Sequence, residues 1–330
     1  MCFVLVSAYL PRNNPYMNIE ERIQKKIALA PFSTYRIGGS AEYFMEADTE
    51  EDLREALIWA RAKKLPVTIL GGGSNILISD AGVTGLVLKP AHGGIERRAT
   101  TLIVGAAAAV WDVAEFALTN ALSGIEWSIG IPGAMGGAIR GNAGAHGGSF
   151  DQVVRRVRFY DESRLVFDDI TASACGFAYR HSAFKENTQQ IIWEVEMELR
   201  EGDSTEMKKV MEGYREYRRT SQPKEPSAGC VFKNFLVTDI VRANPQVLEM
   251  AESEGKVRGG KIGAGYLIEK VGMMGKKIGG ARISDKHANF VVNDGGATAS
   301  DVASLMNLTR EAVRSAYGIE MENEVQYLGF

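Results

Sequence analysis

Glycine-rich segments are the feature of this sequence that most restricts its fold. Residues 130–148 read GIPGAMGGAIRGNAGAHGG, and eight of these nineteen residues are glycine. Bulky residues such as Ile131 and Met135 interrupt the run, which excludes a simple flexible linker. Because a long loop without secondary structure is uncommon inside a compact domain unless it has a function, the segment is predicted to bind a ligand.

A second glycine-rich segment, GGGSN at residues 71–75, follows the apolar run PVTIL, which is typical of a buried strand. Successive backbone N–H groups in such a turn can bind an anion. The segment fails the dinucleotide fingerprint of a Rossmann domain, because Ile76 stands at the third glycine position and a strand-like sequence follows. A plain tight turn is the competing interpretation of this segment alone. Together, the two segments predict a dinucleotide-sized cofactor.

Composition and charge exclude several functional classes. A net charge of −3 over 330 residues gives no bulk reason to expect binding to nucleic acid or to an anionic membrane. The three cysteines, Cys2, Cys175 and Cys230, match no metal or redox spacing, and the histidines are scattered as well. We therefore expect no metal site and no disulfide, as in a reduced, cytoplasmic protein.

The first residues, MCFVLVSAYLPRNNPY, contain a short apolar run. The run lacks the basic region and the small-residue cleavage site of a signal peptide, and it is too short to span a bilayer. We expect residues 1–16 to form a disordered extension, or Met17 to be the true start, with export as the less favoured alternative.

The rest of the chain mixes helical and strand patterns. Thr49 is a predicted N-cap, because acidic residues follow it in the first turn of a helical pattern, and Thr298 or Ser300 is predicted to cap the last helix. A break at Gln222–Pro223 is the predicted domain boundary. The predicted helices span residues 49–65, 111–122, 206–220, 244–255, 263–272 and 297–317, and the predicted strands span 41–47, 66–70, 153–160, 191–200, 287–294 and 321–330.

Cys230 stands in an unusual context, PSAGCVFKN at residues 226–234. Small turn residues precede it and polar residues follow it, whereas a structural cysteine more often lies in an apolar segment, as Cys175 does. The residues alone leave two interpretations open, a small packing residue and a chemically active group.

Motifs along most of the chain resemble those of the UDP-N-acetylenolpyruvoylglucosamine reductase family. The resemblance spans roughly residues 30–328, in the same order as in that family. The glycine-rich loops alone are shared more loosely with other flavoproteins of the vanillyl-alcohol-oxidase fold. The segments that carry the resemblance are TYRIGGSAEYF (34–44), ILGGGSN (69–75), residues 130–148, YRHSAFK (179–185), PSAGCVFKN (226–234), AGYLIEKVGMMGKKIGGARISDKHANFVVN (264–293) and NEV (323–325).

The resemblance implies an α+β fold with two FAD-binding subdomains and a C-terminal α+β domain that binds the substrate. The expected boundaries are 17–100 together with the returning strand 321–330, then 101–221, then 222–320. The family reaction is NADPH-dependent reduction of the enolpyruvyl double bond of UDP-N-acetylglucosamine enolpyruvate, which gives UDP-N-acetylmuramate for peptidoglycan synthesis. The resemblance thus implies tightly bound FAD, NADPH as hydride donor and small-molecule partners.

Three residues match the catalytic positions of the family. Cys230 matches the proton donor, where many members have serine; a thiol with an ordinary pKa of about 8.5 is protonated at pH 7 and is a better acid than a hydroxyl. Arg180 matches the arginine that binds the substrate carboxylate. Glu324 matches the C-terminal glutamate, and we expect its pKa to be raised. Glu322 would face the same side of a strand, and only the motif spacing favours Glu324.

Further positions are implied by the same motifs. The expected substrate-binding residues are Tyr179, Lys233, Asn234 and His287. The expected FAD-binding residues are Thr34, Ile37, Gly71, Gly72, Gly73, Ser74, Asn75, Gly130, Ile131, Pro132, Gly133, Gly136, Gly137, Asn142, Ala143 and Gly144.

One departure identifies the type within the family. Some members carry a long tyrosine-bearing loop before the helix predicted at 206–220, but only residues 201–204 or so intervene here. The chain is therefore similar to the type that lacks this loop. Two alternatives share the glycine-rich loops: another FAD-dependent oxidase or dehydrogenase, and a flavin-binding module without catalytic activity. The first has no reason to keep AGCVFKN together with HANFVVN, and the second would not need Cys230, Arg180 and Glu324 together.

Overall fold

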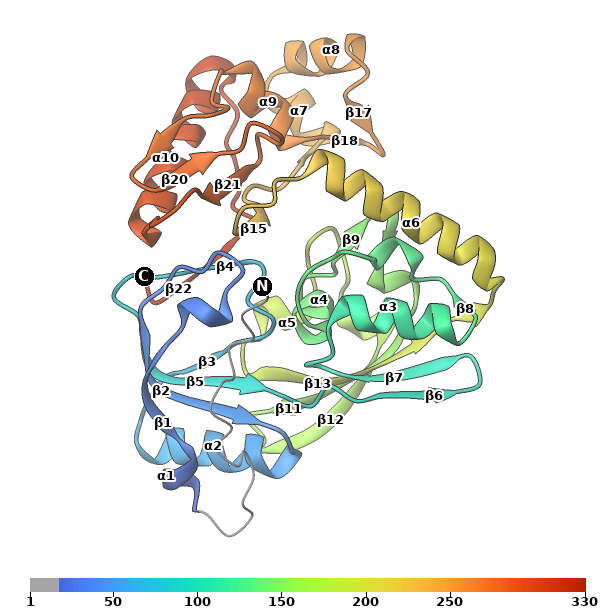
Figure 1. Cartoon of the computed structure of the whole chain (residues 1–330), viewed down its shortest axis with the longest axis vertical. Helices are drawn as coiled ribbons and strands as arrows, with labels where there is room; N and C mark the ends of the chain where they lie inside the picture. Colours follow the sequence, from blue (N-terminus) through green and yellow to red (C-terminus); the bar gives the residue numbers. More distant parts are fainter. Residues whose placement is uncertain (1–17) are drawn as a thin grey trace, which may run out of the picture.

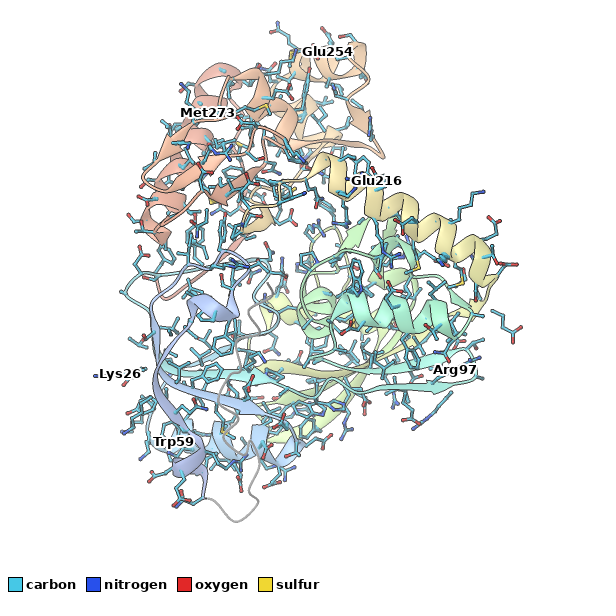
Figure 2. All side chains as sticks on the ribbon, viewed as in Figure 1. Lys26, Trp59, Arg97, Glu216, Glu254 and Met273 are labelled. Atoms are coloured by element: carbon cyan, nitrogen blue, oxygen red, sulfur yellow. The ribbon has the colours of Figure 1, made fainter. Side chains whose placement is uncertain are left out.

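Residues 18–330 are the part of the chain that the computed structural model describes, and they fold into three lobes (Figure 1). The predictions for residues 1–16 and Met17 lie outside the described residues. The first lobe holds the N-terminal strands, the second holds the middle of the chain, and the third lies at the top of Figure 1. Figure 2 shows side chains of the lobes facing the region between them, where residues distant in sequence can meet.

The first lobe is built on a sheet with strand order β1-β2-β5-β3, in which β2, β5 and β3 run parallel. Helix α2 (Glu50–Ala62) covers the sheet and buries Leu53 and Leu57 in its core. Thr49 caps this helix, as predicted, in a capping box with Asp52. The strands are β1 (Gln24–Ala28), β2 (Ser40–Ala47), β3 (Val67–Ile69) and β5 (Val83–Pro90).

The second lobe is built on an antiparallel sheet with strand order β12-β11-β13-β7-β6. Helix α3 (Val110–Thr119) and the long helix α6 (Ser204–Ser221) contact each other above the sheet (Figure 1). The predicted helices at 111–122 and 206–220 are thus confirmed with small shifts at their ends. The strands are β6 (Ile95–Arg98), β7 (Thr101–Gly105), β11 (Val154–Asp161), β12 (Val166–Thr171) and β13 (Gln190–Glu198).

The glycine-rich segment at 130–148 is not the unbroken loop that the sequence suggested. It contains helix α4 (Met135–Arg140), followed by a small hairpin of β9 (Gly144–Ala145) and β10 (Gly148–Ser149). Met135 and Ile139 are four residues apart, and both are buried in the core of the second lobe. Their burial supplies the free energy that holds a glycine-containing helix, which helix propensity alone disfavours.

The third lobe packs helices against a sheet with strand order β15-β21-β20-β19. Helix α10 (Ala299–Tyr317) lies against β20 and β19, and Thr298 is its N-cap. The apolar core of this lobe extends to Tyr35, Ile37 and Leu77 of the first lobe, so the two lobes share buried surface. The strands are β15 (Ser227–Cys230), β19 (Lys277–Ile278), β20 (Ala281–Ile283) and β21 (Phe290–Asn293), and the other helices are α7 (Val237–Ala243), α8 (Pro245–Ser253) and α9 (Ala264–Lys270).

The C-terminal segment returns from the third lobe to the first. Strand β22 (Gln326–Leu328) pairs in parallel with β4 (Ile76–Ile78), the strand that follows the GGGSN turn. The strand predicted over 321–330 is therefore shorter than expected, because residues 321–325 cross between lobes and bond to irregular segments. The remaining elements are α1 (Ile19–Arg22), α5 (Ala183–Glu186), β8 (Leu122–Ser123), β14 (Arg200–Glu201), β16 (Phe235–Leu236), β17 (Val257–Arg258), β18 (Lys261–Ile262), and the 3-10 turns η1 (Ala30–Phe32), η2 (Glu126–Ser128), η3 (Phe150–Gln152) and η4 (Ala172–Cys175).

A carboxylate of the first lobe also caps a helix of the third. The Asp80 oxygens accept hydrogen bonds from the backbone N–H groups of Ala299, at 2.8 Å, and Ser300, at 3.0 Å. These are among the N–H groups that the first turn of α10 leaves without helical partners, and the helix dipole favours a negative charge there. Asp80 therefore ties the first lobe to the third.

We expect Asp80→Ala to lower the free energy of unfolding by about 1–2 kcal/mol, because two N–H groups of α10 lose their acceptor. Asp80→Asn keeps one acceptor oxygen without the charge, so its loss should be intermediate. Urea unfolding followed by circular dichroism measures both variants. An alanine variant with an unchanged midpoint and slope would contradict the assigned contribution.

Candidate active site

Arg180 and Glu324 meet between the second lobe and the C-terminal segment. The Arg180 Nε atom lies 2.8 Å from the Glu324 Oε1 atom, and the side chains are 26% and 14% exposed. The Arg180 Nη1 atom donates a long hydrogen bond, 3.5 Å, to the Gly144 carbonyl. Because one nitrogen is nearly at the limit of hydrogen bonding, the guanidinium retains donor capacity for an incoming anion.

Glu324 is more buried than Glu322, the nearby glutamate from which the strand pattern of the sequence did not distinguish it. Burial raises the pKa of Glu324, as expected, although Arg180, Lys185 and Lys233 act in the opposite direction. Glu322 is 74% exposed and pairs with Lys233 at 2.7 Å. The expectation that both glutamates face one side of a strand is wrong, since β22 begins only at Gln326.

Cys230 ends strand β15, and the residue as a whole is partly exposed although its thiol group is buried. Its neighbours are fixed by Asn289, whose side chain accepts from the Phe232 N–H at 3.0 Å and donates to the Phe232 carbonyl at 2.8 Å. Burial raises the pKa of the Cys230 thiol to about 12; Glu324 adds to the rise, whereas Arg180 lowers the pKa. The thiol is therefore neutral at physiological pH and carries a proton next to the Arg180–Glu324 pair.

Two of the expected substrate-binding residues, Tyr179 and Asn234, meet at the junction of the second and third lobes. The Tyr179 hydroxyl accepts a hydrogen bond from the Asn234 backbone N–H at 3.3 Å, and the Lys261 ammonium lies 3.8 Å from the centre of the Tyr179 ring. The Asn234 side chain accepts from the Ala264 N–H at 3.2 Å. Tyr179 and Asn234 thus connect the two lobes and Lys261 adds a positive charge.

His287 lies beside this group with a more structural environment. Its Nδ1 atom accepts a hydrogen bond from the Asn289 N–H at 3.3 Å, and its ring lies against Phe290. Burial lowers the pKa of His287, so the ring is neutral at pH 7. The Asn289 side chain also holds the backbone of Phe232, so His287 is linked through Asn289 to the segment that follows Cys230.

The two glycine-rich segments touch each other backbone to backbone. A Cβ atom at Gly72 would lie 2.5 Å from the Ala134 nitrogen, and one at Gly133, where φ is +107°, would lie 2.3 Å from the Ser74 hydroxyl. The Ser74 hydroxyl donates to the Pro132 carbonyl at 3.0 Å. Glycine is required here because any side chain would separate the two loops.

Open space remains beside these contacts. A Cβ atom at Gly137 would meet nothing within 4 Å, and one at Gly71 would approach only the Gly137 nitrogen, at 3.9 Å. A pocket of about 290 Å³ is lined by Gly71 together with residues that include Thr34 and Lys89. Exposed backbone around an open path fits an elongated, phosphate-containing group such as FAD.

Other expected FAD-binding positions support the loops from within. The Asn142 side chain donates to the Ala178 carbonyl and accepts from the Asp151 N–H, both at 3.1 Å, so it joins the glycine-rich segment to the loop that carries Arg180. The Thr34 N–H donates to the Gly73 carbonyl at 3.0 Å. Among the remaining positions of this group, Ile37 is buried and the Asn75 side chain donates to the Glu324 carbonyl.

The other positions lie within the second lobe. Ile131 and Ala143 pack against the apolar core of that lobe, and Gly144 pairs with Ser149 in the β9–β10 hairpin. Gly130 lies close to Arg218, and Gly136 lies close to Ala106.

Three basic residues of the site were not identified from the sequence. The Lys185 ammonium donates to the Arg180 carbonyl at 2.7 Å, Arg140 donates to the Gln326 side chain at 2.9 Å, and Arg218 acts electrostatically on Cys230 and Arg180. Lys185 lies within the YRHSAFK motif, which was a usable signal. A basic residue on a helix is usually solvated, so pattern alone did not select Arg140 or Arg218.

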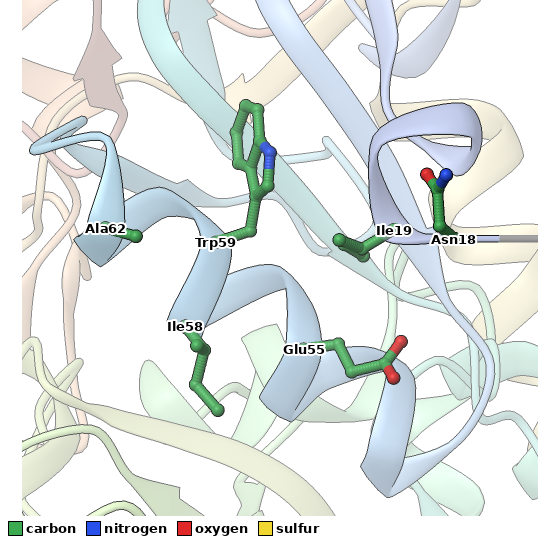
Figure 3. A pocket seen from close by; sticks show the side chains of 6 residues that line it. All are labelled: Asn18, Ile19, Glu55, Ile58, Trp59 and Ala62. Atoms are coloured by element: carbon green, nitrogen blue, oxygen red, sulfur yellow. The ribbon is translucent and has the colours of Figure 1, made fainter.

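A larger pocket lies away from this site. It measures about 400 Å³ and is formed by α1 and α2, with Trp59 and Ile58 among its lining residues (Figure 3). It contains none of the expected site residues. Among residues 18–330, no group of three or more His, Cys, Asp or Glu side chains is arranged to hold a metal ion. Within the same residues, every helix is too short or too polar to cross a bilayer.

Comparison with known families finds matches to two parts of the chain. Residues 222–328 match the C-terminal domain of UDP-N-acetylenolpyruvoylglucosamine reductase, and residues 41–164 match an FAD binding domain. The first match contains Cys230 and Glu324, and the second contains both glycine-rich segments. The FAD-binding fold and the FAD cofactor are thereby confirmed.

Individual proteins are similar over nearly the whole chain. The UDP-N-acetylenolpyruvoylglucosamine reductase of Solibacter usitatus is 37% identical over 91% of this chain and 95% of its own length. That of Synechococcus sp. (strain JA-3-3Ab) is 36% identical over 97% of this chain and 96% of its own. The crystal structure of the enzyme from Thermus caldophilus aligns with a TM-score of 0.74 at 30% identity, covering 93% of this chain and 99% of that one. The protein therefore belongs to the UDP-N-acetylenolpyruvoylglucosamine reductase family.

Proposed function

We propose that this protein reduces UDP-N-acetylglucosamine enolpyruvate to UDP-N-acetylmuramate, with Cys230, Arg180 and Glu324 as its catalytic residues. The observation that carries the proposal is that Arg180 pairs with Glu324 and that both side chains act electrostatically on the Cys230 thiol, although the three residues come from distant segments of the chain. FAD, when bound, supplies the hydride chemistry between NADPH and C3 of the enolpyruvyl group. The chain's own residues must bind the substrate carboxylate, stabilise charge and deliver a proton to C2.

Cys230 is the proposed proton donor to C2. Because its pKa is raised, the thiol keeps its proton at neutral pH and can release it to a carbon that has become strongly basic. Arg180 and Arg218 then face the thiolate that remains, and both lower the pKa of Cys230. Their positive charges limit the cost of leaving a negative sulfur in a buried site.

Arg180 and Glu324 are proposed to act together on the enolpyruvyl carboxylate. A guanidinium pairs with a carboxylate through two hydrogen bonds and stabilises the additional negative charge that develops beside it. Glu324 lies against the same guanidinium, and its raised pKa favours a shared or retained proton. A protonated Glu324 avoids repulsion and can donate a hydrogen bond to the substrate carboxylate.

The remaining assignments complete the proposal. Tyr179, Lys233, Asn234 and His287 are proposed to surround the sugar nucleotide, which is the small-molecule partner together with NADPH. We propose that residues 17–100 with 321–330, and residues 101–221, form the FAD-binding part, and that residues 222–320 form the substrate domain. A cytoplasmic location suits both the soluble substrates and the unpaired thiol Cys230.

We expect Cys230→Ala to separate the two half-reactions. NADPH should still bleach the flavin at the wild-type rate, whereas reoxidation by the enolpyruvyl sugar nucleotide should slow by about 10²–10⁴-fold. Stopped-flow absorbance measures both steps in the same protein. Cys230→Ser is the matched control and should retain substantial activity, since a hydroxyl can also donate. Fast reoxidation in the alanine variant would remove Cys230 as the proton donor.

The raised pKa of Cys230 predicts its reactivity. Only the thiolate attacks iodoacetamide, so alkylation should be slow at pH 8 and should rise about tenfold per pH unit through pH 10, without levelling off near 9. The measurement requires Cys2 and Cys175 to be replaced by alanine, so that a single thiol is followed by mass spectrometry. A rate that levels off near pH 8.5–9 would show an ordinary thiol.

Gly137 tests the position of FAD. It lies in helix α4 with open space at its Cβ position, so Gly137→Ala should stabilise the apoprotein by about 0.5–1 kcal/mol. If FAD occupies that space, the same methyl group should weaken FAD binding at least tenfold in a fluorescence titration. Gly213→Ala on α6 is the matched control, because its Cβ is equally unobstructed. Equal FAD affinities for both variants would place the cofactor elsewhere.

A further inference from the structure

Lys185 makes a contact that none of the expected roles explains. It lies on the single-turn helix α5, just after the loop that carries Arg180, and its ammonium group donates to the Arg180 carbonyl at 2.7 Å. The side chain is half-buried, and burial lowers its pKa. Burying an ammonium group requires compensation, and the charged hydrogen bond to a main-chain carbonyl supplies part of it.

The backbone of Arg180 is in an unfavourable conformation. Its φ angle is +55°, in the left-handed region that residues with a side chain seldom adopt. Ala178 and His181 exchange backbone hydrogen bonds at 3.1 Å in both directions, so Arg180 is the third residue of a tight turn. A turn with positive φ at this position favours glycine or asparagine. An arginine keeps this strained conformation only where the surrounding structure holds it there.

We propose that Lys185 is a positioning residue that holds the Arg180 turn in this conformation and thereby directs the guanidinium to Glu324. The carbonyl of Arg180 is the group that must be fixed, because holding its oxygen in place also fixes the orientation of the peptide plane that follows Arg180 in the turn. Lys185 holds that carbonyl, while Arg180 Nε meets Glu324 at 2.8 Å. The catalytic consequence rests on the proposed function, but the geometric consequence does not.

The first test compares Lys185→Met, which removes the donor, with Lys185→Arg, which retains one. We expect Lys185→Met to slow flavin reoxidation by the enolpyruvyl sugar nucleotide by about 10–100-fold, with reduction by NADPH unchanged, and Lys185→Arg to recover most of the loss. Lys63→Met is the matched control, because Lys63 pairs with Glu20 on the surface of the first lobe. Equal reoxidation rates for Lys185→Met and Lys63→Met would overturn the proposal.

A double-mutant cycle shows whether Lys185 acts through Arg180. In an Arg180→Met background, Lys185→Met should cause less than a twofold further change, because the side chain to be positioned is gone. A further tenfold loss would mean that Lys185 contacts substrate directly, and would overturn a positioning role.

A readout without substrate keeps this proposal separate from the proposed function. Arg180 lowers the pKa of Cys230, so misplacing its guanidinium should slow alkylation of Cys230 at pH 9. Lys185→Met should slow alkylation at least threefold, as Arg180→Met does, and the double variant should be no slower than either. This pattern would support the role of Lys185 even if no variant, nor the wild type, reduced the enolpyruvyl sugar nucleotide. Alkylation that is unchanged in Lys185→Met but slowed in Arg180→Met would overturn it.

Discussion

The arrangement of the three lobes depends on the contacts that Glu324 makes. The Glu324 backbone N–H donates to the Val231 carbonyl of the third lobe at 2.8 Å, and the Glu324 carbonyl accepts a hydrogen bond from the Asn75 side chain of the first lobe at 3.1 Å. Its side chain pairs with Arg180 of the second lobe. One residue is therefore bonded to all three lobes, and the site exists only where those lobes are correctly placed.

Burial explains the chemistry that this junction can perform. A carboxyl group and a thiol are both buried here, so both hold their protons more strongly than in solution, and the charge of the Glu324 carboxylate further opposes ionisation of the Cys230 thiol. Nearby cations partly offset this effect of burial. Arg180 lowers the pKa of both groups, and Lys185 lowers the pKa of Glu324. The combination suits a reaction in which the enzyme must bind an anion, stabilise added negative charge and give up one proton.

Local patterns in the sequence located the longest helices and several of the strands, but they missed others, such as the eight-residue strand β5. Thr49 was identified as a cap, and Thr298 was one of two candidates with Ser300, because a side-chain oxygen and nearby acids satisfy helix N–H groups, and this chemistry is local. Helix α4 was missed, because its glycines oppose helix formation and only burial of Met135 and Ile139 offsets that tendency. The same reasoning fails for Glu322, where strand periodicity was assumed but the chain is irregular.

The sequence by itself determined the family, the cofactor class and the three candidate catalytic residues, because motifs preserve residue type and order. Only the tertiary structure decided which glutamate is buried, that Lys185 supports the Arg180 turn, and that the two glycine-rich loops leave an open path beside Gly137. The physical reason is that charge, burial and free space depend on groups brought together from distant segments. The sequence specifies which chemical group each residue carries, whereas the pKa and the bonding partners of that group depend on the residues packed around it.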